Sequence, residues 1–409
     1  MRYLIIGSST AGIGAVEGIR QVDRDGEITV VSRENCHTYS RPLISYLLQG
    51  KVTEEKMKYR DDSFFERMGC NFLRGKTVTE IHPDEKKVVL DDGSSIMYDR
   101  LLVATGSDPF VPPIEGLDTV SEKFTFMSLD DARRLDAALS RDKRVLIVGA
   151  GLIGLKCAEG ILNKVGGVTV VELAPRILSS ILDDEGAKIV QEHLEKKGIG
   201  FRLSAGVSRI DGSRAVLTTG EEIEFDLMVL AAGVRPNTAL LSGIADIDRG
   251  IIINEKCETT ASGIYAAGDC TQTLDISSGQ KRIMAILPNA YMQGECAGIN
   301  MAGGDASFDK AIPMNAIGFF GLHMITAGNY FGHVYAQSGK RGYKRLFYSN
   351  NRLNGYILIG DVEKAGIYTS LIRAQTPLDS IDFELICEKP GLMAFTREVR
   401  SQKLGGAVS

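Results

Sequence analysis

The chain has 409 residues, of which 44% are hydrophobic and 24% are charged, a composition typical of a soluble globular protein with two or three domains. With a formal charge of −5, the protein has no overall positive potential that would attract polyanions, so neither nucleic acid nor an anionic membrane surface is an expected partner. Apolar runs fall short of the ~20 residues of a membrane span and the first residues do not resemble a secretory signal, so we expect a cytoplasmic protein.

The cysteines argue against a metal centre and against a disulfide framework. Seven are scattered along the chain, at positions 36, 70, 157, 257, 270, 296 and 387, and none forms a Cys-x-x-Cys pair. That spacing excludes the usual local ligand sets for zinc and for iron-sulfur clusters. An odd number of cysteines in a reducing compartment also disfavours structural disulfides. We therefore expect no metal ligand.

The first predicted unit is a βαβ module. A strand over residues 1–6 precedes the loop GSSTAG, a helix over 13–21 and a strand ITVVS that ends near Glu34. Glycines permit the tight turn, and the helix N-terminus offers free N–H groups to a pyrophosphate. Ser9 stands where the motif usually has its middle glycine. The candidate cofactor-binding residues here are Gly7, Ser9, Thr10, Ala11 and Gly12.

A second βαβ module follows, with every glycine of the motif in place. The strand RVLIV at 144–148 leads into GAGLIG, a helix through Lys164 and the strand VTVVE, which ends at Glu172. The context of a strand before and a helix after makes this a strong dinucleotide-binding pattern. The candidate residues are Gly149, Gly151, Leu152, Ile153, Gly154 and Glu172.

Each module is followed by a copy of a second repeat. YDRLLVATGSDPFVPP at 98–113 and FDLMVLAAGVRPNTAL at 225–240 share an aspartate, an apolar strand, Ala-x-Gly and proline. Thr105 and Gly106 in the first copy and Gly233 in the second are further cofactor-binding candidates. A duplicated module implies two dinucleotides bound facing each other, for which a redox reaction is the simplest reason. One of the two is expected to be a flavin.

Glu172 indicates which nicotinamide cofactor is preferred. A carboxylate at the end of the second strand accepts hydrogen bonds from both ribose hydroxyls of NAD, whereas a 2′-phosphate would meet like charge. At ~4 Å that repulsion is on the order of a few kcal/mol. NADH is the expected cofactor and NADPH the alternative, because Arg176 lies close in sequence.

These motifs, together with GIYAAGDC at 263–270, resemble the FAD-dependent pyridine nucleotide-disulfide oxidoreductase family. The resemblance implies FAD and NAD(H) as cofactors, Gly268 and Asp269 beside the flavin ribityl chain, and Glu34 on the adenosine ribose. It also implies that PNAYMQG at 288–294, with Asn289 and Ala290, starts a helix aimed at the flavin, where a positive helix end stabilises negative charge.

The family implies an α/β fold of glutathione-reductase type, with two Rossmann-type domains and an α+β C-terminal domain. By that resemblance, residues 1–112 and 243–310 form a discontinuous FAD domain and residues 113–242 the NAD domain. Residues 311–409 form a C-terminal interface or dimerisation domain. A homodimer and a subunit of a larger complex both stay open.

The segment NCHTYSRPLISY at 35–46 indicates the branch of the family. Its thiol-dependent members place their reactive cysteine near residues 40–42, whereas Cys36 comes before the helix expected there. The segment resembles instead the branch without that cysteine, which contains rubredoxin and ferredoxin reductases, the flavin part of nitrite reductase and the phenylglyoxylate dehydrogenase flavoprotein subunit. The resemblance implies that Arg41 and Pro42 line the flavin.

In ferredoxin-reductase-like members of this branch, a lysine stands at the position of Tyr46 and a glutamate at the position of Lys156. Lys156 is a candidate for a role beside the flavin, and a solvated helix lysine is its alternative. The predicted function is hydride transfer between NADH and FAD, with single electrons passing to or from a rubredoxin-like, ferredoxin or iron-sulfur partner. A thiol-dependent oxidase, peroxide or disulfide reductase and a non-catalytic flavin-binding subunit are the alternatives.

Overall fold

The structure is a computed structural model that describes residues 1–339 and 342–405, the last four of these without their side chains. The chain divides into two compact units. The first unit contains both dinucleotide modules, and the second contains the C-terminal part of the chain. The first comprises residues 1–180, 187–273 and 282–309, and the second residues 181–186, 274–281 and 310–409.

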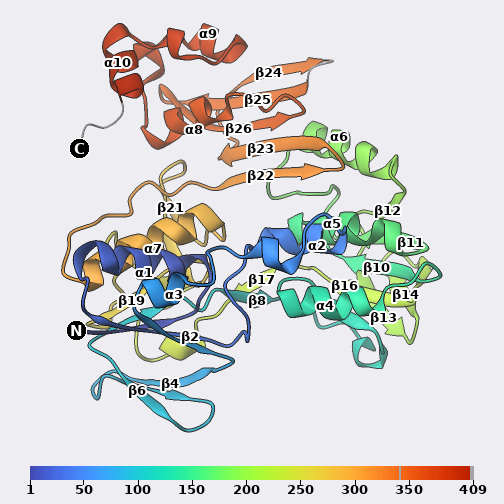
Figure 1. Ribbon diagram of the computed structural model, residues 1–409. Helices are drawn as coiled ribbons and strands as arrows, with labels where there is room; N and C mark the ends of the chain where they lie inside the picture. Colours follow the sequence, from blue (N-terminus) through green and yellow to red (C-terminus); the bar gives the residue numbers. More distant parts are fainter. Residues whose placement is uncertain (340–341, 406–409) are drawn as a thin grey trace. The chain divides into compact units, whose positions relative to one another are not determined.

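A parallel five-stranded sheet in the order β19-β7-β1-β2-β3 is built around the first glycine-rich loop (Figure 1). Its strands are β1 Arg2–Ile6, β2 Glu27–Ser32, β3 Cys70–Arg74, β7 Arg100–Val103 and β19 Ile264–Ala266. Because β1 pairs with β2 on one side and with β7 on the other, the loop after β1 lies where the strand order reverses. Ligands of open parallel sheets bind at such a point.

Helices α1 (Thr10–Val22) and α7 (Leu287–Met301) lie side by side in Figure 1 and touch through their backbones. A Cβ added at Gly14 would lie 2.4 Å from the Tyr291 carbonyl oxygen, and one at Gly294 would lie 2.0 Å from the Ala11 carbonyl oxygen. The glycines therefore bring α7, from a distant part of the chain, close to the first loop.

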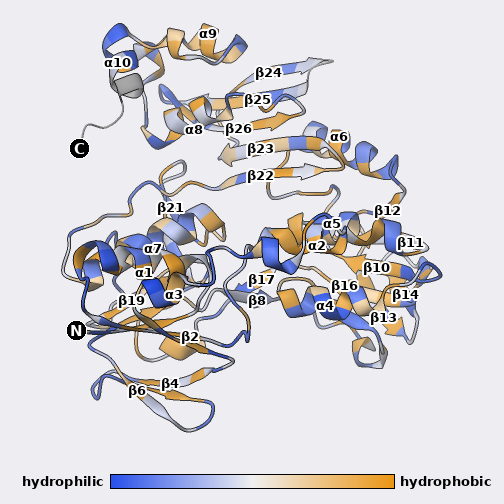
Figure 2. Ribbon diagram, viewed as in Figure 1, coloured by the Kyte–Doolittle hydropathy of each residue, from blue (hydrophilic) through white to orange (hydrophobic). Residues whose placement is uncertain are grey.

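The second glycine-rich loop is built into a matching parallel sheet, in the order β12-β11-β10-β16-β9. Its strands are β9 Lys123–Thr125, β10 Arg144–Val148, β11 Gly167–Val171, β12 Ile199–Arg202 and β16 Leu227–Leu230. Figure 2 shows β10, β16 and helix α5 (Leu152–Ile161) coloured mainly hydrophobic, as strands covered on both faces require. Both βαβ modules and the two-Rossmann-domain fold are thus confirmed.

The two copies of the second repeat pair with each other. Strand β8 (Ser107–Pro109) is antiparallel to β17 (Val234–Pro236), with Ser107 opposite Pro236. Thr105 Oγ1 donates a hydrogen bond to the Asn237 carbonyl oxygen at 2.7 Å, and Asn237 Nδ2 donates one to the Thr105 carbonyl oxygen at 3.1 Å. The sequence repeat therefore joins the two modules physically.

Helix α1 begins earlier than expected. It starts at Thr10, whereas the apolar pattern predicted a start at Ile13, because Ser9 is extended and serves as the N-cap. The other predicted boundaries were close: α5 ends at Ile161 and a 3-10 turn continues to Lys164, and α7 starts one residue before Pro288.

The remaining strands form antiparallel sheets and short pairings. In the first unit or at its edges these are β4 Val78–His82, β5 Lys87–Leu90, β6 Ser95–Met97, β13 Val207–Asp211, β14 Arg214–Leu217, β15 Glu222–Glu224, β18 Ile251–Ile252, β20 Thr271–Asp275 and β21 Gln280–Arg282. The other helices before residue 287 are α2 Ile44–Leu48, α3 Phe64–Arg67, α4 Leu129–Ala138 and α6 Asp184–Glu195.

The second unit contains a five-stranded antiparallel sheet in the order β22-β23-β26-β25-β24. Its elements are β22 Met314–Phe319, β23 Leu322–Gly328, β24 His333–Gly339, β25 Gly342–Ser349, β26 Arg352–Ile359, α8 Ala365–Arg373, α9 Phe383–Glu388 and α10 Arg397–Gly405. Tyr356 and Tyr368, both fully buried, lie in its core. None of the helices in the described ranges is long and apolar enough to cross a membrane.

Candidate functional site

A cavity of about 410 Å³ opens at the end of β1. Its wall brings together distant parts of the first unit, among them the first glycine-rich loop, the 33–41 loop, the 104–107 turn, the 267–269 turn and the start of α7. The predicted residues that line it are Gly7, Ser9, Thr10, Ala11, Glu34, Arg41, Thr105, Gly106, Gly268, Asp269 and Ala290.

The two glycine-rich loops have nearly the same geometry. Gly7 has a φ of +114°, and a Cβ added there would lie 2.1 Å from the Ala104 carbonyl oxygen. Gly149 has a φ of +112°, and a Cβ added there would lie 2.3 Å from the Ala231 carbonyl oxygen. Ser9 and Gly151 are both N-caps, with φ of −78° and −77°. Serine is therefore accommodated at the middle position because the backbone there needs no left-handed conformation.

The N-terminus of α1 is open toward the cavity. The Ser9 side chain makes no capping hydrogen bond, and Thr10 and Ala11 of the first turn line the wall. Uncapped N–H groups at a helix start bind phosphate well, since the helix dipole adds to their hydrogen bonds. This end of the cavity fits a pyrophosphate.

Asp269 offers a carboxylate to the same cavity. Ser107 Oγ donates a hydrogen bond to Asp269 Oδ2 at 3.4 Å, and burial raises the pKa of Asp269 above its ordinary value despite that bond and the charge of Arg41. A buried carboxylate of this kind gains from added hydroxyl donors. A polyhydroxylated chain such as the ribityl group of FAD would supply them.

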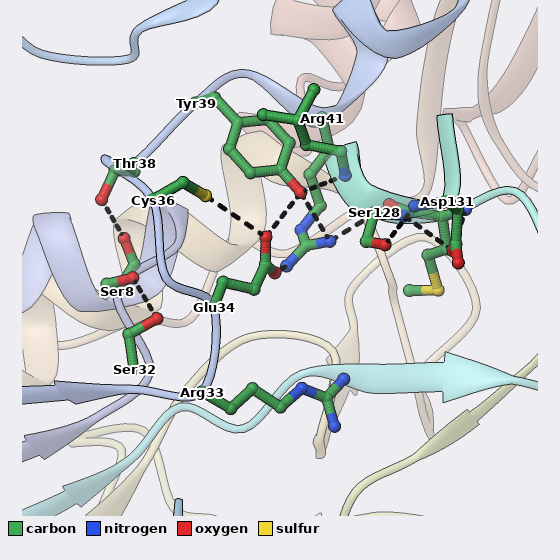
Figure 3. Close-up of polar contacts among 12 residues, drawn as sticks. Ser8, Ser32, Arg33, Glu34, Cys36, Thr38, Tyr39, Arg41, Ser128 and Asp131 are labelled. Carbon is green, nitrogen blue, oxygen red and sulfur yellow. Dashed lines mark hydrogen bonds and ion pairs between the residues drawn. The ribbon is translucent and has the colours of Figure 1, made fainter. Parts of the chain in front are cut away.

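A hydrogen-bond network centred on Tyr39 includes Glu34 and Arg41, which also line the cavity (Figure 3). The Tyr39 hydroxyl donates to Glu34 Oε2 at 2.7 Å and accepts from the Leu129 amide at 2.8 Å. Arg41 forms an ion pair with Glu34 and donates to the Met127 carbonyl oxygen at 3.1 Å. The network thus links the cavity to the start of α4.

Two serines and a threonine tie the 33–41 loop to the glycine-rich loop. Thr38 Oγ1 donates to the Ser8 carbonyl oxygen at 2.6 Å, and Ser8 Oγ donates to Ser32 Oγ at 2.9 Å (Figure 3). The start of α4 is fixed in turn by a capping box between Ser128 and Asp131. The cavity wall is therefore held by side-chain hydrogen bonds at both ends.

Cys36 lies in this wall but is held as a thiol. It precedes the 3-10 helix Arg41–Leu43, and its Sγ lies 3.9 Å from Glu34 Oε2, to which it donates. Burial, followed by the Glu34 charge, raises the pKa of Cys36 to about 11. A redox cysteine requires the opposite shift, because the thiolate is the nucleophile.

At the second loop, Glu172 contacts the backbone. Its Oε2 accepts from the Ala150 amide at 2.7 Å and its Oε1 from the Ala174 amide at 2.9 Å. A Cβ added at Gly151 would meet no described atom within 4 Å, so the space beside the N-terminus of α5 is clear for a second pyrophosphate. The carboxylate at the end of β11 lies where a ribose would be recognised.

Lys156 is on α5 and faces α2. Its ammonium forms an ion pair with Glu159 and lies 4.6 Å from the centroid of the Tyr46 ring. The positions at which relatives were expected to have an ion pair therefore hold a cation–π contact, and Glu159, one turn further on, provides the anion. Lys156 is 13% exposed and is not part of the cavity wall.

Several predicted residues also lie outside that wall. Gly12 packs against the Gly7 carbonyl oxygen, Pro42 is exposed on its 3-10 helix, and Asn289 is buried within α7. Ile153 and Gly233 line a small recess together with Met127, which also borders the cavity.

Sequence reasoning missed Tyr39, Met127 and Asn237. Two of them had a signal: Tyr39 lies in the 35–46 segment that indicates the branch, and Asn237 directly follows the proline of the second repeat copy.

The fold and the site define an oxidoreductase class with two dinucleotide-binding modules. Residues 1–294 match the family model described as pyridine nucleotide-disulphide oxidoreductase, so the chain belongs to that family. It is an NAD(P)H-dependent oxidoreductase that uses FAD. Residues 313–376 match the C-terminal domain of rubredoxin NAD+ reductase.

Individual relatives agree with this assignment. The chain is 33% identical to the NADH-dependent phenylglyoxylate dehydrogenase subunit epsilon of Aromatoleum evansii, over 98% of this chain and 97% of that one. It is 35% identical to an NADH oxidase of Methanocaldococcus jannaschii, over 75% and 71% of the two chains. A covalent putidaredoxin reductase–putidaredoxin complex shares the fold, with a TM-score of 0.87 at 22% identity over 95% and 96%.

Proposed function

We propose that this protein passes electrons between NADH and a separate one-electron carrier protein. When bound, FAD accepts a hydride from NADH and releases its electrons singly. The chain's own residues position the two cofactors: the helix N-termini bind the pyrophosphates, Asp269 and Glu34 accept from hydroxyl groups, and Glu172 selects NADH.

The observation that best supports this proposal is that Cys36 is protonated. It is the one cysteine among the described residues that line the cavity, and its raised pKa keeps it protonated beside Glu34. A disulfide or peroxide reductase needs a thiolate next to the flavin. Within the described part of the chain, no group of three or more histidine, cysteine or acidic side chains could hold a metal. A rubredoxin, ferredoxin or iron-sulfur subunit is therefore the proposed acceptor.

The relatives support this choice in general terms. A subunit of an NADH-dependent phenylglyoxylate dehydrogenase and a reductase trapped with putidaredoxin both work with a further protein, by their names. We assign residues 1–112 and 243–310 to the FAD domain, residues 113–242 to the NAD domain, and residues 311–409 to an interface with a second copy or a larger complex. The proposed location is the cytoplasm, since seven free cysteines suit a reducing compartment.

Anaerobic titration with NADH tests the proposal. The flavin absorbance should bleach, and oxidised rubredoxin or ferredoxin added afterwards should restore it. The Cys36→Ser variant should behave as the unaltered protein. Loss of turnover in that variant would favour a thiol-dependent NADH oxidase; one relative is named NADH oxidase. A flavin that NADH does not bleach would indicate a non-catalytic flavin-binding subunit.

A further inference from the structure

Two cysteines distant in sequence meet behind the cavity wall. Cys296 lies on α7, whose residues Leu287 and Ala290 line the cavity, and Cys257 lies in the turn at residues 254–258 before β19. Both side chains are buried, with 0% and 5% exposure for Cys257 and Cys296. Cys296 Sγ contacts the turn that carries Cys257, 3.5 Å from the Glu255 carbonyl oxygen, and each of the two thiols shifts the pKa of the other.

Hydrogen bonds join helix α7 to the turn at residues 254–258 beside this pair. Asn300 Nδ2 donates to the Lys256 carbonyl oxygen at 3.1 Å and to Cys296 Sγ at 3.5 Å. Cys296 Sγ in turn lies 3.5 Å from the Glu255 carbonyl oxygen. Cys257 has a φ of +62°, which is uncommon for a residue with a side chain and holds its thiol in this position.

The two thiols are not equivalent. Hydrogen bonds from the Cys257 thiol and from Asn300 lower the pKa of Cys296, against the effect of burial. The contact with Cys296, followed by burial, raises the pKa of Cys257 well above its usual range. Cys296 is therefore suited to attack as the thiolate and Cys257 to follow as the resolving thiol.

We propose that Cys257 and Cys296 form an oxidisable dithiol, at which a hydroperoxide makes a disulfide between the turn and α7. The Cys296 thiolate attacks one oxygen of hydrogen peroxide, the O–O bond breaks, and a sulfenic acid and water result. Cys257 then attacks that sulfur and releases the second water. Two thiols lose two electrons and two protons, and one peroxide becomes two waters, so the reaction balances.

The disulfide would restrain a helix that carries part of the cavity wall. Gln293 Oε1 on α7 accepts from the Gly268 amide at 2.8 Å, one position before Asp269. A covalent link at Cys296, one turn further along α7, limits the opening of this corner. We expect the oxidised protein to release FAD at least about twofold more slowly than the reduced protein.

The test is peptide mapping of the flavin-loaded protein after treatment with excess hydrogen peroxide. Remaining thiols are blocked with N-ethylmaleimide under denaturing conditions before digestion and mass spectrometry. Of the seven cysteines, two should escape blocking, and the peptides containing Cys257 and Cys296 should be recovered as one disulfide-linked species. Dithiothreitol should separate them, and flavin release is then timed for both forms.

Serine variants show which cysteines form the disulfide. Cys257→Ser and Cys296→Ser should each abolish the linked species, whereas the matched control Cys70→Ser, at a more exposed cysteine, should retain it. Mapping of the unaltered chain does not depend on how the variants fold. The proposal is overturned if Cys257 and Cys296 are both still blocked by N-ethylmaleimide under peroxide that oxidises Cys70. It is also overturned if Cys296 is oxidised to sulfinic acid while Cys257 stays a thiol, or if either cysteine forms a disulfide with another residue.

Discussion

Replacing Tyr39 by phenylalanine should weaken the flavin site more than its small size suggests. The substitution removes one oxygen atom from a side chain that is 7% exposed. That hydroxyl donates to the Glu34 carboxylate at 2.7 Å and accepts from the Leu129 amide at 2.8 Å. Burial raises the pKa of Tyr39, so the hydroxyl keeps its proton and remains a donor across the usual pH range.

The magnitude follows from the two shorter of the three hydrogen bonds that are lost, since the third, donated by Arg41 Nη1, is long at 3.4 Å. A hydrogen bond to a charged group contributes about 1.5–3 kcal/mol, and an amide left buried without an acceptor costs about 1–3 kcal/mol. Glu34 keeps its ion pair with Arg41, so the first contribution is only partly lost. We expect the free energy of unfolding to fall by about 2–4 kcal/mol in Tyr39→Phe. FAD should bind roughly tenfold more weakly or worse, because 1.4 kcal/mol corresponds to a factor of ten.

The chain offers a matched control in Tyr98. Its side chain is 2% exposed, and its hydroxyl has no hydrogen-bond partner among the described residues. Tyr98→Phe removes the same atom from a similar degree of burial and should change stability by less than about 0.5 kcal/mol. Urea denaturation followed by circular dichroism, together with fluorescence titration of FAD, measures both variants. Equal losses in the two would refute the role given to the Tyr39 network.

Three further changes test other parts of the site. Glu172→Gln should raise the ratio of kcat/KM for NADPH to that for NADH about tenfold or more, and an unchanged ratio in steady-state assays would remove its role in selection. In Gly12→Ala, the new Cβ would lie 2.0 Å from the Gly7 carbonyl oxygen, so thermal melts should show a loss of at least about 2 kcal/mol. Gly366→Ala on α8, where a Cβ meets nothing within 4 Å, should instead be neutral or stabilising. Cys36, with a pKa of about 11, should react with iodoacetamide at pH 8 about tenfold or more slowly than an unfolded-chain cysteine, and fast labelling would contradict its protonated state.

The sequence predicted the parts of the fold that depend on local constraints. Gly7 and Gly149 need a left-handed backbone beside a neighbouring strand, and such glycines recur at fixed spacing between an apolar strand and a helix. The exact start of α1 was missed because Ser9 can cap the helix without leaving the glycine-loop conformation. Periodicity alone does not distinguish this from a longer loop.

The contacts that hold the site were not predictable in the same way. Tyr39 and Leu129 are 90 positions apart, and no motif contains both. Cys257 and Cys296 have no spacing that marks them as a pair. Such pairings depend on how separate elements pack, and a single sequence does not encode that packing as a local pattern.

The nearly buried charge at residue 156 is balanced by its neighbours on α5 and α2. A lysine cation placed on α5, at residue 156, would be costly to bury alone, since its side chain is only 13% exposed. Glu159 lies one turn away and pairs with it, and the Tyr46 ring covers it at 4.6 Å. The Lys156 cation is therefore compensated by Glu159 on its own helix and by the Tyr46 ring on α2. Changing Lys156 alone to glutamate would place a second carboxylate beside the buried Glu159, so positions 46, 156 and 159 should be exchanged as a set.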